Sequence, residues 1–263
     1  MGQLLMNLNV VEVYDWGYNK LMTPVVQLFA TCIIDTLYPE IGQAVVNVLE
    51  RAGMRVEFPH GQTCCGQPAF NAGQRDQARP LAMYNIRVFE KVPGFIVVPS
   101  GSCTAMIRHG YLELFAGDDE WLPRAQALAA RTFEFTEFLV DRLGITDLHA
   151  RFPGRITYHS SCHLLRGLGV NRQPRQLLAA VKDAEFVELP YSQECCGYGG
   201  VFSVEQAEIS SAMLQRKIDN IAASTAPVVV SCDAGCLTNI NGGLHRRGLP
   251  QRVMHIAEIL AKQ

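Results

Sequence analysis

Cysteines are the residues of this chain most able to carry chemistry, and eight of its nine recur in the same order in two sets. Each set has a lone cysteine, an adjacent pair followed by glycine, and a second lone cysteine. The first set is Cys32, Cys64, Cys65 and Cys103, and the second is Cys162, Cys195, Cys196 and Cys236. Thiolates are soft ligands for iron and zinc, so this repetition predicts two groups of metal ligands.

Redox-active iron is the metal that this pattern favours. Cysteines can pack as small hydrophobic residues, but packing alone does not explain eight that recur in register. Zinc sites usually use paired C-x-x-C units, and no C-x-x-C occurs in this sequence. The glycine after each pair lets the backbone turn so that both thiolates can face one centre. The ninth cysteine, Cys232, fits equally well as a buried hydrophobic residue or as an extra ligand in the second set.

The composition is that of a globular protein kept in a reducing compartment. The 263 residues are 48% hydrophobic and 18% charged, which is enough apolar material for a sizeable core. A net charge of −2 excludes a general basic surface for nucleic acid or anionic lipid. The N-terminus lacks the features of a signal peptide, and no apolar run has the length of a membrane span. An odd number of cysteines argues against a disulfide framework, so we expect a cytoplasmic protein.

An internal repeat accounts for the two cysteine sets. Residues 26–32 align with 156–162, 62–66 with 193–197 and 97–103 with 230–236, at offsets of 130, 131 and 133. Residues 137–139 resemble 258–260 at an offset of 121, which indicates an insertion in the first half, with 117–123 as the candidate. The predicted organisation is an N-terminal extension at 1–24, a first domain at 25–150 and a second at 151–263, separated by a turn at 151–154.

Within each half, short apolar runs alternate with stretches of helical periodicity, which predicts strands joined by helices. In the first half we expect strands at 25–30, 55–58 and 95–98 and helices at 41–52 and 75–90. In the second we expect strands at 155–159, 185–189 and 228–231 and helices at 175–181 and 204–223. The predicted fold class is α/β, with two tandem pseudo-symmetric repeats that each have a short parallel sheet flanked by helices. Because the cysteines follow strands, each set is expected to meet at the carboxyl edge of its own sheet, giving a pair of pockets.

The spacing of each set resembles the cysteine-rich CCG domain of heterodisulfide reductase and of iron–sulfur subunits such as that of glycolate oxidase. In this chain 31 residues separate Cys32 from Cys64 and 32 separate Cys162 from Cys195. The stretches 62–68, 199–204 and 253–260 narrow the resemblance to the lactate-utilisation protein A family, over residues 25–263. That resemblance implies a two-domain iron–sulfur oxidoreductase subunit that transfers electrons. It also implies action with lactate-utilisation proteins B and C in oxidising L-lactate to pyruvate.

The chain departs from the CCG pattern at one position in each half. The last cysteine of the pattern belongs to a C-x-x-C, but Ser100 and Asp233 stand where its first cysteine would be. Each set therefore offers four thiolates, which suit a [4Fe–4S] cluster, and one or two such clusters per chain are expected. The departure puts in doubt the five-ligand cluster of heterodisulfide reductase. A thiol–disulfide redox enzyme of that kind and a zinc-stabilised scaffold subunit are the alternative hypotheses.

The sequence lacks a dinucleotide-binding fingerprint that would let the chain accept a hydride by itself, so it is better explained as an electron-handling subunit or as half of a shared site. The candidates for binding a substrate carboxylate or moving a proton are His163, Arg166, Arg108 and His109, and His159 also flanks Cys162. We favour the simpler role, in which these residues are exposed or tune the charge of the thiolates. His255, on an apolar stretch, is expected to be structural.

Overall fold

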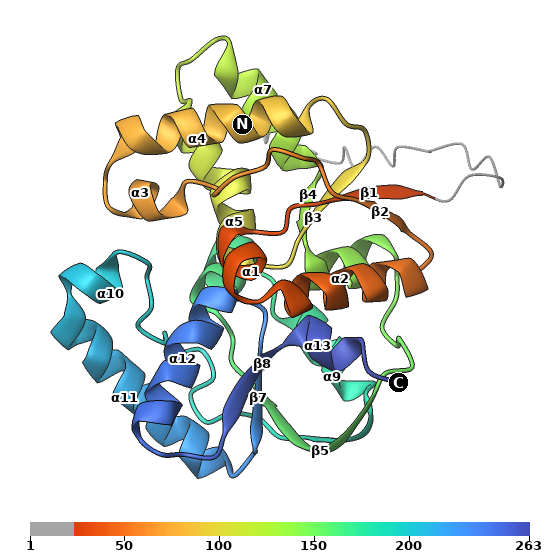
Figure 1. The fold of residues 1–263 in the computed structure, drawn as a ribbon, viewed down its shortest axis with the longest axis vertical. Coiled ribbons are helices and arrows are strands. Elements are labelled where there is room, and N and C mark those ends of the chain that lie inside the picture. The colour runs from red at the N-terminus through yellow and green to blue at the C-terminus, as the bar shows by residue number, and fades with distance from the viewer. Residues whose placement is uncertain (1–23) are drawn as a thin grey trace, which may run out of the picture.

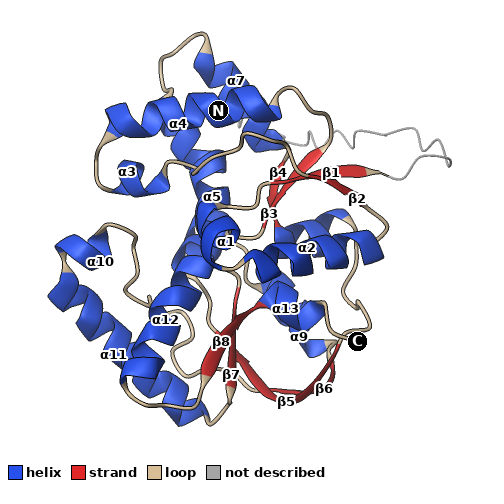
Figure 2. Ribbon diagram, viewed as in Figure 1, coloured by secondary structure: helices blue, strands red, loops and turns tan. Residues whose placement is uncertain are grey.

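Two four-stranded parallel sheets organise the chain in a computed structural model that describes residues 24–263 (Figure 1, Figure 2). The predicted N-terminal extension at 1–24 lies outside the described residues except for Pro24. Helices flank both sheets, and the start of the second half lies beside the C-terminus, where the backbone N–H of Arg151 donates to the carbonyl of Lys262.

The first sheet has the strand order β2-β1-β3-β4. Its strands are β1 (Val25–Leu28), β2 (Arg55–Glu57), β3 (Phe95–Val98) and β4 (Thr132–Glu134). Its helices are α1 (Cys32–Leu37), α2 (Pro39–Arg51), α3 (Gln67–Asn71), α4 (Arg75–Phe89), α5 (Gly101–Ala105), α6 (Tyr111–Leu114), α7 (Trp121–Ala130) and α8 (Phe135–Glu137), with π-helical turns η1 (Met106–Gly110) and η2 (Phe138–Arg142). Every strand pair is parallel, so each connection must cross the sheet, and the helices provide these crossovers.

The second sheet repeats that order as β6-β5-β7-β8. Its strands are β5 (Arg151–Tyr158), β6 (Lys182–Phe186), β7 (Val228–Ser231) and β8 (Arg252–His255). Its helices are α9 (Arg172–Ala179), α10 (Phe202–Glu205), α11 (Ala207–Ser224), α12 (Ala234–Arg246) and α13 (Ile256–Leu260), with a π-helical turn η3 (His163–Gly167). The predicted α/β class with two tandem parallel sheets is therefore confirmed.

Each sheet has a fourth strand that the sequence analysis missed. Strand β4 has 3 residues and strand β8 has 4, and each pairs in parallel with the third strand of its sheet. A run this short shows too little alternation to be separated from a loop, and its strand character comes from pairing with a distant segment.

The turn predicted at 151–154 is wrong, because these residues begin strand β5. Arg151 pairs with Lys182 of β6 and Gly154 pairs with Ala184, with a shift of register between the two pairs. Gly154 has a φ of 112°, a backbone conformation that glycine adopts without the strain of a side chain. The glycine thus accommodates an irregularity within the strand and does not reverse the chain. The division into domains at residue 150 stays a prediction.

The insertion expected near 117–123 coincides with the loop that leads into α7. In the first half, α5, η1 and α6 follow one another directly, and α7 comes before β4. In the described second half, α12 is followed directly by β8, with no helix between them. Asp118 accepts hydrogen bonds from the backbone N–H groups of Glu120 and Trp121 and so fixes the start of α7.

One hydrophobic core joins the two halves. Buried residues of α2, such as Val45 and Leu49, share this core with Ile156 of β5 and Ile259 of α13. Helices α2 and α13 lie side by side between the two sheets (Figure 1), and the Arg51 guanidinium at the end of α2 donates to the backbone carbonyl of Leu260. Within residues 24–263, no helix combines the length and apolar character needed to cross a membrane.

His255 caps α13 and is structural, as expected. Its Nδ1 accepts a hydrogen bond from the N–H of Ala257 at 3.2 Å, so its Nε2 carries the proton and faces the carbonyl oxygen of Pro99 at 3.1 Å. Glu134 caps α8 in the same way, and the two capping boxes are completed by Glu137 and Glu258, the residues aligned in the repeat.

The shared core predicts that replacing Leu49 destabilises the whole chain. Leu49 is fully buried, so we expect Leu49→Ala to lower the free energy of unfolding by about 2–5 kcal/mol. Because both sheets contribute to this core, denaturant unfolding followed by circular dichroism is expected to remain a single transition. Leu37→Ala is the control, since Leu37 is 58% exposed, and an equal loss in both variants would contradict this assignment.

Burial of His255 predicts a pH-dependent contribution to stability. Burial lowers the pKa of His255 from 6.5 to about 4, so the folded chain keeps it neutral while the unfolded chain binds a proton below about pH 6.5. The stability that His255 contributes is therefore present above pH 6.5 and falls as the pH is lowered, by about 2 kcal/mol between pH 7 and pH 5.

The pH dependence of His255 is measured as a difference between two proteins, because buried Glu134, whose pKa is raised to about 8 by burial, changes stability in the opposite direction. The unfolding free energy of wild type minus that of His255→Asn is expected to shrink from pH 7 to pH 5, since Asn keeps a capping oxygen but does not titrate. A difference that stays constant with pH would show that folding does not lower the pKa of His255.

Candidate functional site

The eight repeated cysteines lie just beyond the carboxyl ends of the strands. Cys32 opens α1 after β1, and Cys103 lies in the first turn of α5 after β3. Cys162 follows β5, and Cys236 lies in the first turn of α12 after β7. The Cys-Cys-Gly segments occupy the loops after the second strand of each sheet. Thiols in the first turn of a helix lie near the positive end of its dipole, which favours the thiolate.

Both sets meet at one pocket between the two halves, in place of the separate pockets expected. The cysteines that line it are Cys32, Cys64, Cys65, Cys103, Cys162 and Cys236. The remaining two, Cys195 and Cys196, adjoin it through contacts with Cys162 and Cys236. The carboxyl edges of the two sheets therefore face a common space, and the tandem repeat forms a single composite site.

The thiols of the first set form a chain of contacts. Cys65 Sγ lies 3.5 Å from Cys103 Sγ, and the Cys64 thiol contacts both Cys32 and Cys65. Hydrogen bonds from Cys32 and then Cys65 lower the pKa of Cys64 well below its usual range. The hydrogen bond with Cys64, and then burial, raise the pKa of Cys32, and hydrogen bonds with Cys103 and then Cys64 raise the pKa of Cys65. Four thiols held this close, with the negative charge on Cys64, could act together as ligands of a cationic centre.

The second set has the same arrangement. Cys195 contacts Cys162 and Cys196, and Cys196 contacts Cys236. Hydrogen bonds from Cys162 and Cys196 lower the pKa of Cys195, and the Gly197 N–H, 3.4 Å from Cys195 Sγ, lowers it further. All nine cysteines of the chain are free thiols in this structure. The repeat therefore reproduces the contacts between thiols as well as the spacing of the residues.

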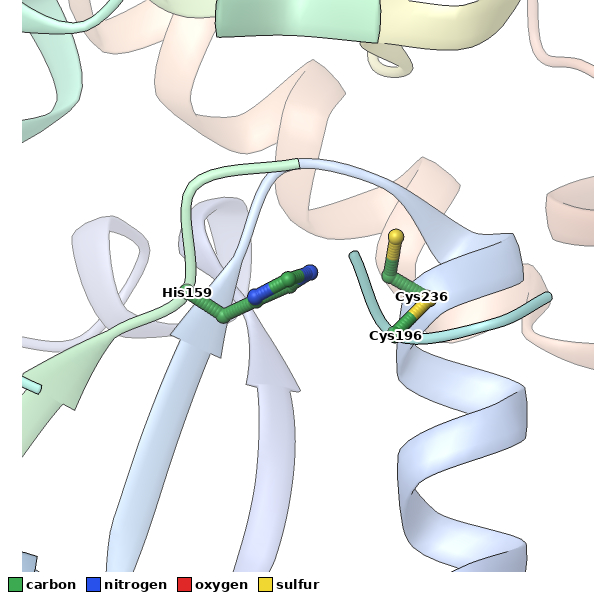
Figure 3. Close-up of side chains that lie close together, drawn as sticks. All are labelled: His159, Cys196 and Cys236. Atoms are coloured by element: carbon green, nitrogen blue, oxygen red, sulfur yellow. The ribbon is translucent and has the colours of Figure 1, made fainter. Parts of the chain in front are cut away.

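A histidine joins the second set, which the sequence analysis had considered only as a neighbour of Cys162. A ring nitrogen of His159 and the sulfurs of Cys196 and Cys236 all lie within 4.8 Å of one another (Figure 3). His159 is fully buried, and neither ring nitrogen has a hydrogen-bond partner of normal geometry among the described residues. Burial, and then the nearby Lys217, lower the pKa of His159 to about 3, so the ring is neutral. His159 directly follows β5, and the sequence pattern at this position does not predict its contact with Cys196 and Cys236.

The two residues that replace the first cysteine of C-x-x-C bind one another across the halves. Ser100 Oγ donates to Asp233 Oδ2 at 3.1 Å, and the backbone N–H of Ser102 donates to the same oxygen at 2.9 Å. Asp233 Oδ1 accepts from the N–H of Gly235 at 3.1 Å and so caps α12, while Ser100 caps α5. In this chain these positions connect the two cysteine sets.

The four candidate catalytic residues differ in their access to the site. His163 lines the pocket, with Nδ1 3.7 Å from Cys162 Sγ. Arg108 is paired with both carboxylate oxygens of Glu137 at 2.9 Å. Arg166 donates to the carbonyl of Gln193, and His109 is exposed. Among the described residues that line the pocket, only His163 comes from this group.

Cys232 directly follows β7, and its side chain lies in the hydrophobic core shared by the two halves. Its sulfur contacts the hydroxyl of Tyr158 at 3.6 Å, and both side chains are buried. Cys232 is absent from the described lining of the pocket, so its placement is that of a small core residue.

Comparisons with known proteins agree with this site. The model of the CCG cysteine-rich domain matches residues 26–108 and again residues 156–241. Lactate utilization protein A of an Exiguobacterium species is 49% identical over 238 residues, which cover 90% of this chain and 97% of that protein. Lactate utilization protein A 2 of Bacillus cereus is 44% identical over 237 residues, which cover 90% of this chain and 98% of that protein.

Among solved structures, a solute-binding protein of an ABC transporter system from Conexibacter woesei matches with 13% identity and a TM-score of 0.25. It covers 88% of this chain and 69% of that chain, and such a low score supports no argument about fold or function. The identity to the curated relatives extends over nearly their whole length and includes both cysteine-rich segments. With two CCG domains and this similarity, the chain belongs to the lactate utilization protein A family.

Proposed function

We propose that this chain is the iron–sulfur, electron-transferring subunit of a complex that oxidises L-lactate to pyruvate. The observation that carries the proposal is the convergence of two four-thiol sets on one pocket. The names of the relatives supply the connection to lactate utilisation. Lactate-utilisation proteins B and C are the proposed partner subunits, and the cytoplasm is the proposed location.

The donor chemistry of the site fits a [4Fe–4S] cluster in each set. Four thiols per set match the four iron atoms of such a cluster, and each set already contains a thiol whose pKa is lowered by its neighbours. The glycine after each pair has a positive φ, 87° at Gly66 and 84° at Gly197. A side chain at Gly66 would approach Ala78 of α4 and one at Gly197 would approach Ser210 of α11, so these glycines let the loops pack closely against those helices.

A bound cluster would supply one-electron transfer, and the protein residues determine where that happens. The first-turn cysteines of α5 and α12 are held near helix N-termini, and Cys65, Cys103, Cys196 and Cys236 are buried. Burial keeps water away from these sulfurs and limits the reorganisation that accompanies a change of charge. Cys32 is exposed at the pocket edge, which leaves this side open to a partner.

The chemistry of lactate oxidation indicates which step a partner subunit would carry out. Oxidation of lactate to pyruvate releases two electrons and two protons, usually through a hydride acceptor such as a flavin or nicotinamide. We propose that a partner subunit provides that hydride acceptor. Clusters bound by the two cysteine sets of this chain would then receive the electrons one at a time.

The shared pocket also favours a second candidate, a thiol–disulfide redox enzyme. A small disulfide in this pocket could contact both sets, and its reduction to two thiols needs two electrons and two protons. Dithionite-reduced chain by itself is the test: stoichiometric cleavage of a small disulfide would favour this candidate, and no cleavage would favour the electron-transfer subunit. A zinc-stabilised scaffold would be recognised by zinc in place of iron and acid-labile sulfide.

Single cysteine substitutions are expected to remove iron from one set at a time. Anaerobically purified Cys64→Ser and Cys195→Ser are each expected to hold about half the iron and sulfide of the wild type, since each loses one of four ligands in its set. Cys232→Ala is the matched control and is expected to keep the full content, because Cys232 packs against Tyr158 in the core. Full iron in either Ser variant would remove that cysteine from the site, and folded wild-type protein without iron or sulfide would refute the proposal.

The loop that contains Cys195 and Cys196 predicts that alanine substitutions at two of its glycines have different effects. A Cβ at Gly197 would lie 2.5 Å from the carbonyl oxygen of Ser210, whereas a Cβ at Gly200 meets nothing within 4 Å. Both have positive φ, so each Ala variant is expected to lose about 1–2 kcal/mol of stability from backbone strain. Gly197→Ala is expected to lose more, and to lose iron from the second set, while Gly200→Ala keeps it. Equal iron content in the two variants would contradict the role of Gly197.

A further inference from the structure

The two cysteine sets lie on equivalent backbones, so their surroundings can be compared residue by residue. The N–H of Phe29 donates to the carbonyl of Val97 at 3.0 Å, and the N–H of His159 donates to that of Val230 at 2.9 Å. Phe29 and His159 therefore occupy the same position, three residues before the first cysteine of each set. Their side chains have opposite properties.

Phe29 and His159 make different surroundings for their sets. Phe29 is buried and stacks on Phe89, with ring centroids 5.3 Å apart, so it gives the first set an apolar neighbour. His159 gives the second set a neutral imidazole whose ring nitrogens have no hydrogen-bond partner within the described chain. One of them lies within 4.8 Å of the sulfurs of Cys196 and Cys236. An unpartnered buried N–H is costly, and these sulfurs are groups able to accept it.

His255 shows that an unpartnered histidine is not general in this core. It is as deeply buried as His159, yet both of its ring nitrogens have partners, the N–H of Ala257 and the carbonyl of Pro99. The orphaned ring of His159 is therefore a local feature of the second set. It is explained if the sulfurs of a bound centre accept its N–H.

A second equivalent pair differs in charge. Gly66 packs against the carbonyl of Ala78 and Gly197 against that of Ser210, and seven residues after these lie Asn85 and Lys217. Both are buried and both anchor the loop before the paired cysteines. Asn85 donates to the carbonyl of Cys64 at 2.9 Å, whereas the Lys217 ammonium donates to those of Tyr191 at 2.9 Å and Ser192 at 3.3 Å. The second set thus has a buried cation where the first has a neutral amide.

Among residues 24–263, the carboxylate of Asp233 is a further charge close to the sets, and it lies between them. One of its oxygens accepts from Ser100 and Ser102, beside Cys103, and the other accepts from Gly235, beside Cys236. Its negative charge acts on Cys162 and Cys236 of the second set and offsets part of the effect of Lys217 there. A higher potential at the second set therefore requires that His159 and Lys217 together outweigh Asp233. Glu194, which also attracts Lys217, is engaged by Arg216 and Asn220.

We propose that the two sets hold centres of unequal reduction potential, with the second set the higher, because His159 donates its ring N–H to that centre and Lys217 adds a positive charge beside it. The inference rests on the proposed iron–sulfur function. Reduction adds negative charge to an iron–sulfur centre, so a hydrogen bond to its sulfur and a nearby cation both favour the reduced form. An electron that enters the chain then comes to rest at the second set before the first.

The test measures each centre alone. Anaerobic Cys195→Ser retains only the first set and Cys64→Ser only the second, and each is titrated with dithionite while its spin-resonance signal is recorded. We expect a higher midpoint potential for the second set. In the Cys64→Ser background, His159→Phe and Lys217→Asn, which install the first-set residues, are each expected to lower that potential. Iron and sulfide content are measured on every variant.

Two further variants separate a specific contact from a general disturbance. His159→Gln keeps an N–H donor and is expected to retain most of the potential, and His159→Leu, which lacks a donor and is smaller, takes the place of His159→Phe if that variant fails to hold iron. His163→Phe is the matched control, because His163 lies beside Cys162 but is only partly buried, so it is expected to change the potential less than His159→Phe.

The outcomes distinguish this inference from the function on which it rests. Iron in both single-set variants with equal potentials, or a potential of the second set that falls no further in His159→Phe than in His159→Gln, would overturn the inference and leave the proposed function standing. Absence of iron from wild type and from both single-set variants would refute the proposed function itself.

Discussion

The structure depends on the packing of two parallel sheets so that their carboxyl edges face one another. A parallel sheet ends all its strands at one edge, and the loops beyond that edge hold the cysteines. The common core of α2, β5 and α13 fixes the two edges at a distance where both sets line one pocket. Without this core, the same sequence motifs would give two unrelated thiol clusters.

The four thiols of each set lie too close together for all of them to be ionised at once. In each set a central thiol, Cys64 or Cys195, has a lowered pKa, and its neighbours stay protonated and donate to it. The N-termini of α5 and α12 and the N–H of Gly197 also face these sulfurs. These groups prepare the site for thiolate ligands, because they already stabilise negative charge.

The repeat has kept its backbone and changed its side chains. Backbone hydrogen bonds, capping boxes and the glycines after the paired cysteines recur in both halves. The side chains around the thiols differ, and Ser100 with Asp233 even forms a bond between equivalent positions. A duplicated scaffold can therefore hold two similar ligand sets in surroundings of different polarity, which a symmetric pair could not provide.

The sequence alone determined the two cysteine sets, the repeat and the fold class, because these leave local signals. The cysteine spacing, the offsets near 130 residues and the alternation of short apolar runs with helical periods all survive without tertiary contacts. The sequence did not predict strands β4 and β8 or the start of β5, since these segments become strands by pairing with distant strands and have only weak local preference. Only tertiary structure brought His159 to Cys196, by the folding of the second half, and Ser100 to Asp233, by the packing of the two halves, because residues so far apart in sequence leave no local signal of their contact.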